Sequence, residues 1–121
     1  MNYSKSSNSK NKIKSFLSDH HGSICQYCGQ STPVSQSTLD HIIAINKGGS
    51  NHISNLLYCC KSCNSSKGKR DIEEFRLFQS IQQSEYKGIL TPKTYLQLLA
   101  IYALPRKVKL VTFQFEKAGD L

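Results

Sequence analysis

The sequence predicts a small α+β domain that is braced by a bound metal ion. Its 121 residues are enough for one compact core and too few for two domains of ordinary size. Two C-x2-C knuckles, Cys25–Cys28 and Cys60–Cys63, indicate a metal-binding framework. Short apolar runs lie close to the knuckles, whereas the stretches after residue 71 have helical periodicity. Strands and helices are therefore expected in separate parts of one domain.

The first part of the chain is expected to hold a flexible segment and a packing helix. Residues 1–12 are rich in Lys, Ser and Asn and have no hydrophobic periodicity, which predicts a flexible basic segment. A short helix is expected from Ser9 to Gly22, because the apolar residues there recur at helical spacing. These apolar residues are Ile13, Phe16 and Leu17.

The segment around the second knuckle is expected to form a strand, a turn and a helix. Residues 39–43 are β-branched and apolar around a polar Asp-His pair, which predicts a short strand. The sequence Lys-Gly-Gly-Ser-Asn at 47–51 predicts a turn. A second apolar run at 56–58 leads into the knuckle, and residues 61–70 after it predict a strongly basic helix.

Two further helices and a strand are expected after residue 71. Asp71 and Glu74 have the spacing of a capping box, and an apolar face over 72–81 predicts the helix that follows. Thr91–Pro92 predicts the start of another helix, which ends before the next proline. Apolar and polar residues alternate at 108–115, which predicts a β-strand. The apolar faces of both helices are expected to pack against the cysteine-rich part.

The cysteines predict a structural zinc site. Each knuckle can place two thiolates on one ion, and four thiolates in tetrahedral array form a closed zinc site. Thiol redox chemistry is disfavoured, because such a site needs one motif beside a βαβ pattern. The fifth cysteine, Cys59, is expected to be a small buried apolar residue. The predicted zinc ligands are Cys25, Cys28, Cys60 and Cys63.

The charge and the apolar content limit the location and partners of the chain. No apolar run is long enough to span a bilayer, so no membrane association is expected. The start lacks the apolar region of a secretory signal, which predicts a cytoplasmic protein in a compartment where disulfides are reduced. A net charge of +8 and a pI near 9.4 favour a polyanionic partner such as nucleic acid.

The run LDHIIAINKGGSNHISNLLYCCKSCNSSKGKRD at 39–71, with CQYCG upstream at 25–29, resembles the HNH endonucleases. The resemblance rests on an Asp-His pair, Gly-Gly, Asn-Leu and C-x2-C-Asn-x2-Lys, in this order and at this spacing. It covers residues 25–71, called the finger below, and implies a ββα-metal fold for them. We therefore expect one nuclease domain over 13–121, with 72–121 as a helical and strand extension of the finger.

The resemblance implies a role for each polar motif residue. His41 would be the general base, and imidazole has the ordinary pKa suited to that task. Asp40 and Asn64 would hold a catalytic divalent cation, and oxygen donors favour Mg²⁺ or Mn²⁺. Asn55 would fix the loop that orients the base. Asn64 stands where many family members have His, which leaves the metal preference open, and Ala44 replaces a frequent Pro.

The resemblance implies an endonuclease that hydrolyses double-stranded DNA by nicking or by double-strand cleavage. The basic residues of the finger would face phosphates, because residues 41–70 contain no acidic residue. Cleavage of both strands needs either a homodimer or two successive binding events by one chain, and the sequence leaves both alternatives open. The alternative function is a zinc-finger module that binds DNA without cutting it. The expected phosphate contacts are Lys61, Lys67, Lys69 and Arg70.

Overall fold

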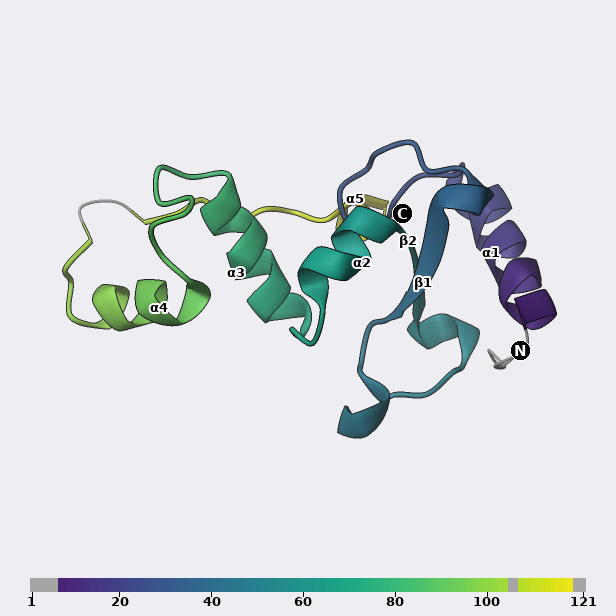
Figure 1. Cartoon of the computed structure of the whole chain (residues 1–121), viewed down its shortest axis with the longest axis horizontal. Coiled ribbons are helices and arrows are strands. Elements are labelled where there is room, and N and C mark those ends of the chain that lie inside the picture. The colour runs from purple at the N-terminus through teal and green to yellow at the C-terminus, as the bar shows by residue number, and fades with distance from the viewer. Residues whose placement is uncertain (1–6, 105–106, 119–121) are drawn as a thin grey trace.

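The computed structural model describes residues 7–104 and 107–118. A two-stranded antiparallel sheet lies near one end of an elongated molecule, and two helices extend from it to the other end (Figure 1). This mixture of helices and strands confirms the predicted α+β class. The elements are α1 (Ser7–His21), β1 (Ser37–His41), β2 (Leu56–Cys60), α2 (Lys61–Lys67), α3 (Ile72–Gln82), α4 (Pro92–Ala100) and α5 (Gln114–Ala118), with single 3₁₀ turns at Val34–Gln36, Ile45–Lys47 and Ile53–Asn55.

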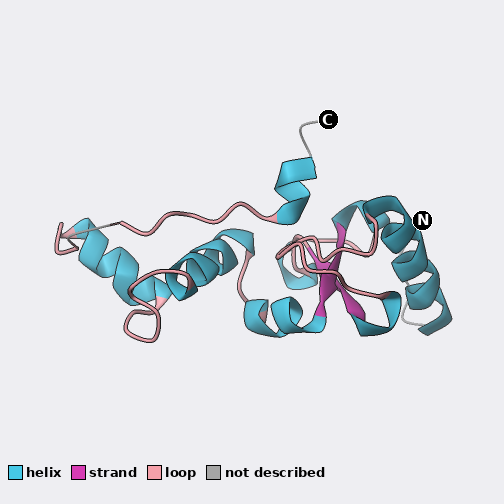
Figure 2. Cartoon of the chain, turned by 90° about the horizontal axis from the view of Figure 1, so that it is seen from above, coloured by secondary structure: helices cyan, strands magenta, loops and turns pink. Residues whose placement is uncertain are grey.

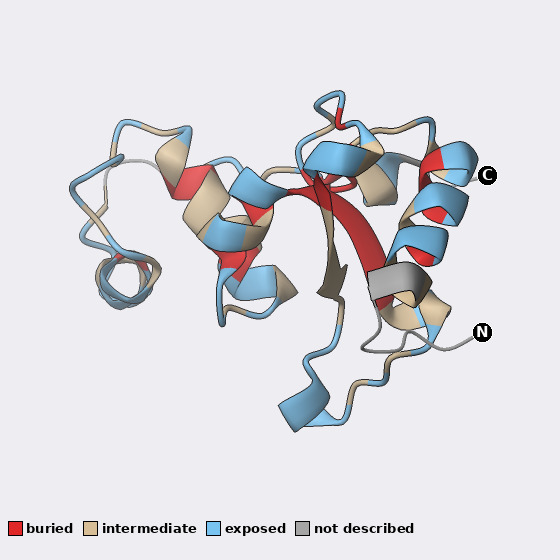
Figure 3. Cartoon of the chain, turned by 45° about the vertical axis from the view of Figure 1, so that its right-hand side comes forward, coloured by how far each residue is buried: buried red, intermediate tan, exposed pale blue. Residues whose placement is uncertain are grey.

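The second strand is buried on both faces. β1 and β2 pair antiparallel from Ser37↔Cys60 to His41↔Leu56. Alternate residues of β2 pack to opposite sides, and every residue of the strand is buried (Figure 3). Leu56 and Tyr58 belong to a cluster with α1, whereas Leu57, Cys59 and Cys60 belong to a cluster with the first knuckle and α3. Burial on two faces explains why the sequence of β2 is continuously apolar.

The helix α1 covers one side of the sheet. Ile13 and Leu17 are buried against β2, as the helical spacing predicts, whereas Phe16 is exposed. The helix begins at Ser7, so the expected flexible segment 1–12 overlaps its first turns at 7–12. Residues 1–6 lie outside the described residues.

The helices α2 and α3 follow the second knuckle in succession. Gly68 ends α2 with a φ of 52°, a conformation that a residue without a side chain adopts easily. Asp71 and Glu74 form the predicted capping box at the start of α3. The predicted apolar face of α3 is also present, because Phe75 and Ile81 are completely buried.

The helix α4 forms an arm that is remote from the sheet (Figures 1 and 2). Thr91 caps it and Pro92 is its first residue, as predicted. It packs against α3, and Tyr95 is its buried residue. Leu96 is 53% exposed and Tyr102 is 95% exposed. The expectation that the apolar face of this helix packs against the finger was therefore wrong.

No strand is present among residues 107–118, so the predicted C-terminal strand was also wrong. Residues 107–113 run toward the finger in an extended form and lead into α5 (Figure 2). Their backbone groups bind side chains of α3 and α4 in place of a neighbouring strand. Val108 N–H donates to Tyr95 Oη at 3.1 Å, and Val111 N–H donates to Ser80 Oγ at 3.0 Å. The apolar face of this tail instead brings Phe113 into the core beside the first knuckle.

None of the helices in the described ranges has the length and apolar character needed to cross a membrane.

Candidate functional site

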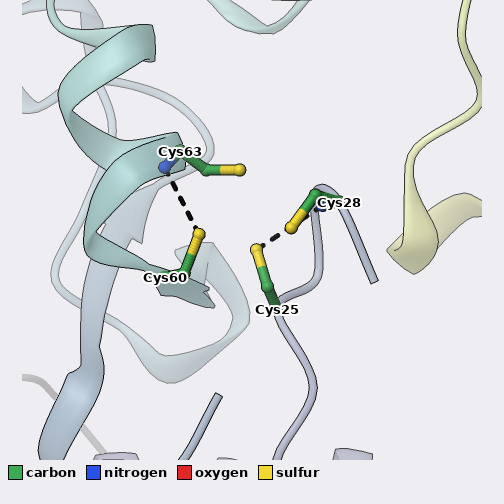
Figure 4. Close-up of side chains that lie close together, drawn as sticks. All are labelled: Cys25, Cys28, Cys60 and Cys63. Atoms are coloured by element: carbon green, nitrogen blue, oxygen red, sulfur yellow. Dashed lines mark hydrogen bonds between the residues drawn. The ribbon is translucent and has the colours of Figure 1, made fainter. Parts of the chain in front are cut away.

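Four cysteine sulfurs converge where the two knuckles meet (Figure 4). The Sγ atoms of Cys25, Cys28, Cys60 and Cys63 all lie within 4.8 Å of one another. A tetrahedral zinc ion with Zn–S bonds of about 2.3 Å has its sulfurs about 3.8 Å apart, so a small contraction closes the cluster on one ion. The predicted grouping of these cysteines is confirmed, and the cluster can hold a metal ion.

The surroundings of the cluster also suit a metal. Cys28 N–H points to Cys25 Sγ at 3.5 Å, and Cys63 N–H points to Cys60 Sγ at 3.4 Å. Backbone donors of this kind stabilise negative charge on sulfur. The hydrogen bond with Cys63 lowers the pKa of Cys25 to about 4 and raises the pKa of Cys63. A lowered pKa favours the thiolate of Cys25, the form that binds metal.

The fifth cysteine lies apart from this chemistry. Cys59 is completely buried in the apolar cluster on the knuckle side of β2. Burial raises the pKa of its thiol, so it stays protonated and unreactive. This agrees with its prediction as a small apolar core residue.

Asp40 is held by two donors on one oxygen. It lies on β1, and its Oδ2 accepts a hydrogen bond from Tyr27 Oη at 2.5 Å and pairs with Lys67 Nζ at 3.0 Å. The Asp40 side chain is 13% exposed. Oδ1 has no hydrogen-bond partner among the described residues, and it is not a buried atom. Asp40 therefore keeps one carboxylate oxygen available to a cation.

Asn64 offers a second oxygen from α2. It lies one turn before Lys67, the residue that reaches Asp40, so both side chains are on the same face of the helix. The Asn64 side chain is half-buried and makes no hydrogen bond to a described residue. A carboxylate oxygen and an amide oxygen are donors that a hard cation prefers. The donor set of Asp40 and Asn64 thus fits Mg²⁺ or Mn²⁺.

His41 ends β1 and contacts the loop that follows. Its Nε2 lies 2.8 Å from Asn51 Oδ1. Because an amide oxygen accepts, Nε2 donates this hydrogen bond. Asn51 was not predicted as a partner of His41, because its place in the Gly-Gly-Ser-Asn run indicates only a turn.

Asn55 ties the same loop to the strand. Its Oδ1 accepts from Ile43 N–H at 2.9 Å, and its Nδ2 donates to Ile43 O at 2.9 Å and to Ser50 O at 2.7 Å. The loop is tight, because a Cβ on Gly49 would lie 1.8 Å from Ile43 O. These contacts are of the type that the resemblance implies for Asn55, and they fix the loop bearing Asn51.

The four predicted phosphate contacts have different surroundings. Lys61 and Lys69 are exposed. Lys67 is 5% exposed and pairs with Asp40, a position unlike the phosphate-facing one expected for it. Arg70 is half-buried, with its guanidinium 4.0 Å from the centre of the Phe78 ring. A cavity of about 300 Å³ beside the loop is lined by Lys67, Lys69 and Arg70, and by Lys47, which the sequence analysis did not select.

The comparisons with known proteins agree with the motif. A family model described as HNH endonuclease matches residues 25–77, which confirms the predicted resemblance for this segment. Among solved structures, the chain is similar to the Type II-C Cas9 enzyme from Actinomyces naeslundii, with 28% identity and a TM-score of 0.51. That match covers 55% of this chain and only 7% of the Cas9 chain. No curated protein matches the chain.

Proposed function

We propose that the chain is a metal-dependent endonuclease that hydrolyses phosphodiester bonds of double-stranded DNA. The observation that carries the proposal is the oxygen pair of the finger. Among the described residues, Asp40 Oδ1 on β1 and the Asn64 amide on α2 have no hydrogen-bond partner, and both lie within the segment that matches the HNH endonuclease model. The match to the HNH endonuclease model and the similarity to a Cas9 enzyme support this class of reaction for the finger.

His41 is proposed as the general base. Its Nε2 contacts Asn51, and its imidazole is proposed to take a proton from the attacking water. Asn55 supports this step indirectly, because it fixes the loop that carries Asn51. The ring is thereby oriented before the substrate arrives, which lowers the entropic cost of reaching the reactive geometry.

Asp40 and Asn64 are proposed to hold Mg²⁺ or Mn²⁺. When bound, such an ion offsets the negative charge that develops on the phosphate and the leaving oxygen. The four cysteines are proposed to hold Zn²⁺, which joins the first knuckle to the start of α2 and so keeps Asn64 in place. The two sites differ in ligand type, since thiolates select zinc and oxygens select the harder cation.

The exposed lysines of α2 and of the residues that follow it are proposed to bind DNA phosphates. Lys61 and Lys69 are exposed, and no acidic residue lies between positions 41 and 70. Binding through phosphates releases counterions, so affinity should fall as salt rises. Lys67 is left out of this set because its ammonium group pairs with Asp40.

A plasmid assay tests the proposal. The zinc-loaded chain is incubated with supercoiled plasmid and Mg²⁺ or Mn²⁺, and His41→Ala is compared with His52→Ala. His52 is a matched control, since it is exposed on the same loop and its ring bonds to Ser54, away from His41. We expect His41→Ala to bind DNA without nicking it and His52→Ala to nick it.

Two outcomes would count against the proposal. Equal cleavage by wild type and His41→Ala would refute His41 as the base. Binding by the wild type without cleavage under either cation would support the alternative, a zinc-finger module that binds DNA and does not cut it.

A further inference from the structure

We infer that Tyr27 is a positioning residue that orients Asp40 and so couples the cysteine cluster to the proposed cation site. The inference rests on the proposed function, because it takes Asp40 as a cation ligand. Neither the motif nor the expected roles of its residues assign a function to Tyr27. Three features of Tyr27 matter: its position in the first knuckle, the packing of its ring, and the Asp40 oxygen that its hydroxyl contacts.

Tyr27 starts inside the first metal knuckle. It lies between Cys25 and Cys28, and its backbone oxygen accepts a hydrogen bond from Gln114 N–H at 3.0 Å. From there its side chain reaches β1, where Oη donates to Asp40 Oδ2 at 2.5 Å. One residue therefore joins the backbone of the cysteine cluster directly to a proposed cation ligand.

The ring of Tyr27 is held on several sides, and the residue is 3% exposed. Phe75 of α3 meets it edge-on with ring centres 5.1 Å apart, and Phe113 does the same at 5.2 Å. Phe115 adds a third edge contact at 6.3 Å. A ring packed in this way cannot swing without opening the core, so the position of its hydroxyl is fixed.

The hydroxyl determines which oxygen of Asp40 is presented. A carboxylate on a strand can rotate about its last torsion and exchange its two oxygens. Tyr27 and Lys67 both bind Oδ2, which leaves Oδ1 directed away from them and accessible. Partners of this kind, which hold a ligand in place without touching the metal, contribute about 10- to 100-fold to metal affinity.

The inference also gives α3 and the tail a part in the site. Phe75 and Phe113 come from the extension after the finger, for which the sequence offered no function. Their rings form the walls on either side of Tyr27. Loss of either wall is expected to loosen Asp40 although neither residue approaches the cation.

A second buried tyrosine provides a matched control. Tyr58 is 0% exposed, and its Oη donates to Thr32 O at 2.5 Å. It belongs to the cluster under α1, on the other side of β2 from Tyr27. Replacing Tyr58 with Phe removes a buried hydroxyl of the same kind without touching Asp40.

Direct Mn²⁺ binding tests the inference without measuring cleavage. The zinc-loaded full chain is titrated with Mn²⁺ in the absence of DNA, and free Mn²⁺ is followed by its electron paramagnetic resonance signal. Wild type is compared with Tyr27→Phe, Tyr58→Phe and Asp40→Asn, and zinc content and thermal stability are recorded for each. We expect Tyr27→Phe to weaken Mn²⁺ binding about 10-fold or more at unchanged zinc content, and Tyr58→Phe to leave binding unchanged.

The outcomes separate this inference from the proposed function. If Asp40→Asn weakens Mn²⁺ binding and Tyr27→Phe does not, Tyr27 is not a positioning residue and the nuclease proposal stands. If Asp40→Asn binds Mn²⁺ as the wild type does, Asp40 is not a cation ligand. The proposed cation site and the role of Tyr27 would then both be refuted. Equal losses in Tyr27→Phe and Tyr58→Phe would show a general effect of instability and would also overturn the inference.

A measurement on the wild type covers the case in which Tyr27→Phe fails to fold. A cation on Oδ1 withdraws charge from Oδ2 and so weakens the hydrogen bond from Tyr27. Mn²⁺ should therefore change the ultraviolet difference spectrum of tyrosine in wild type and equally in Tyr58→Phe. A saturating amount of Mn²⁺ that leaves the spectrum unchanged would overturn the inference.

Discussion

Arg76 is expected to be the main polar link between α3 and the tail. Its guanidinium binds both carboxylate oxygens of Glu116 at 2.6 Å, and it also donates to Val111 O at 2.9 Å. The same group lies 4.8 Å from the centre of the Phe113 ring and contacts Glu73 on its own helix at 2.8 Å. Replacing Arg76 with Met keeps much of the apolar stem and removes every one of these polar contacts.

The contacts of Arg76 differ in expected energy. The Glu73 side chain is 74% exposed, so this pair contributes at most about 0.5 kcal/mol. The pair with Glu116 is bidentate, and the Glu116 side chain is only 32% exposed, so this pair is expected to contribute about 1–2 kcal/mol to the free energy of unfolding. The hydrogen bond to Val111 O adds about 1 kcal/mol, and the contact with the Phe113 ring adds about 0.5 kcal/mol. We therefore expect Arg76→Met to lower the free energy of unfolding by about 3 kcal/mol.

Urea unfolding of the zinc-loaded chain measures this loss, and two double-mutant cycles divide it. The Arg76–Glu116 cycle uses Glu116→Gln, and the Arg76–Glu73 cycle uses Glu73→Gln as the control. The first coupling energy should exceed the second by about 1 kcal/mol. A Glu73 coupling as large as the Glu116 coupling would refute the reasoning, because exposure would then not decide the energy of these pairs.

Further changes have definite expected results. The hydrogen bonds from Arg76 lower the pKa of Glu116. The contribution of this pair to the free energy of unfolding is therefore complete above the ordinary carboxyl pKa and is lost as acid protonates Glu116, which urea unfolding at a series of pH values should show. Gly49→Ala should cost more than about 2 kcal/mol in urea unfolding and abolish nicking, because its Cβ would collide with Ile43 O at 1.8 Å. A chelator that strips the cysteine cluster should unfold the finger, seen as a loss of circular dichroism that Zn²⁺ restores. Changing Lys61 and Lys69 to Gln should weaken DNA binding to a similar degree for all DNA sequences. In fluorescence anisotropy titrations, the slope of log K against log salt concentration should fall in magnitude by about 1 per lysine.

Local signals in the sequence predicted the helices well. The Asp71 capping box and the Thr91–Pro92 start both lie where the sequence places them, because a cap uses residues within one turn of each other. The cysteine cluster was equally accessible to prediction, since two knuckles of this spacing have few structural uses other than joining on one ion.

Apart from the cysteine cluster, partners distant in sequence were not predicted. The alternating tail at 108–115 has the composition of a strand, but β-structure needs an available neighbour, and the tail lies along α3 and α4 instead. Tertiary contacts therefore decided the conformation of this segment. The apolar residues of α4 likewise have the spacing of a core helix, yet α4 lies on an arm that brings only Tyr95 into the interior.

In the candidate site, too, the sequence indicates which residues are present but does not indicate which residues they contact. The resemblance implies Asp40, His41 and Asn64 as site residues from the order and spacing of the motif, and these roles stay predictions. It did not show that Lys67 pairs with Asp40 or that Asn51 holds His41, because these contacts depend on how the loop and α2 approach β1. Tyr27 was missed for a related reason, since a tyrosine within a knuckle has no sequence signal for its hydrogen-bond partner.

The return of the tail to the first knuckle affects the order in which the protein can mature on the ribosome. Phe113 forms one wall beside Tyr27, and Gln114 bonds to the knuckle backbone. The finger is synthesised before these residues, so a nascent finger has an open side until Phe113 and Gln114 have left the exit tunnel. Closure across so many residues slows folding, and it delays the final arrangement around Asp40 until residues 113 and 114 are available to pack.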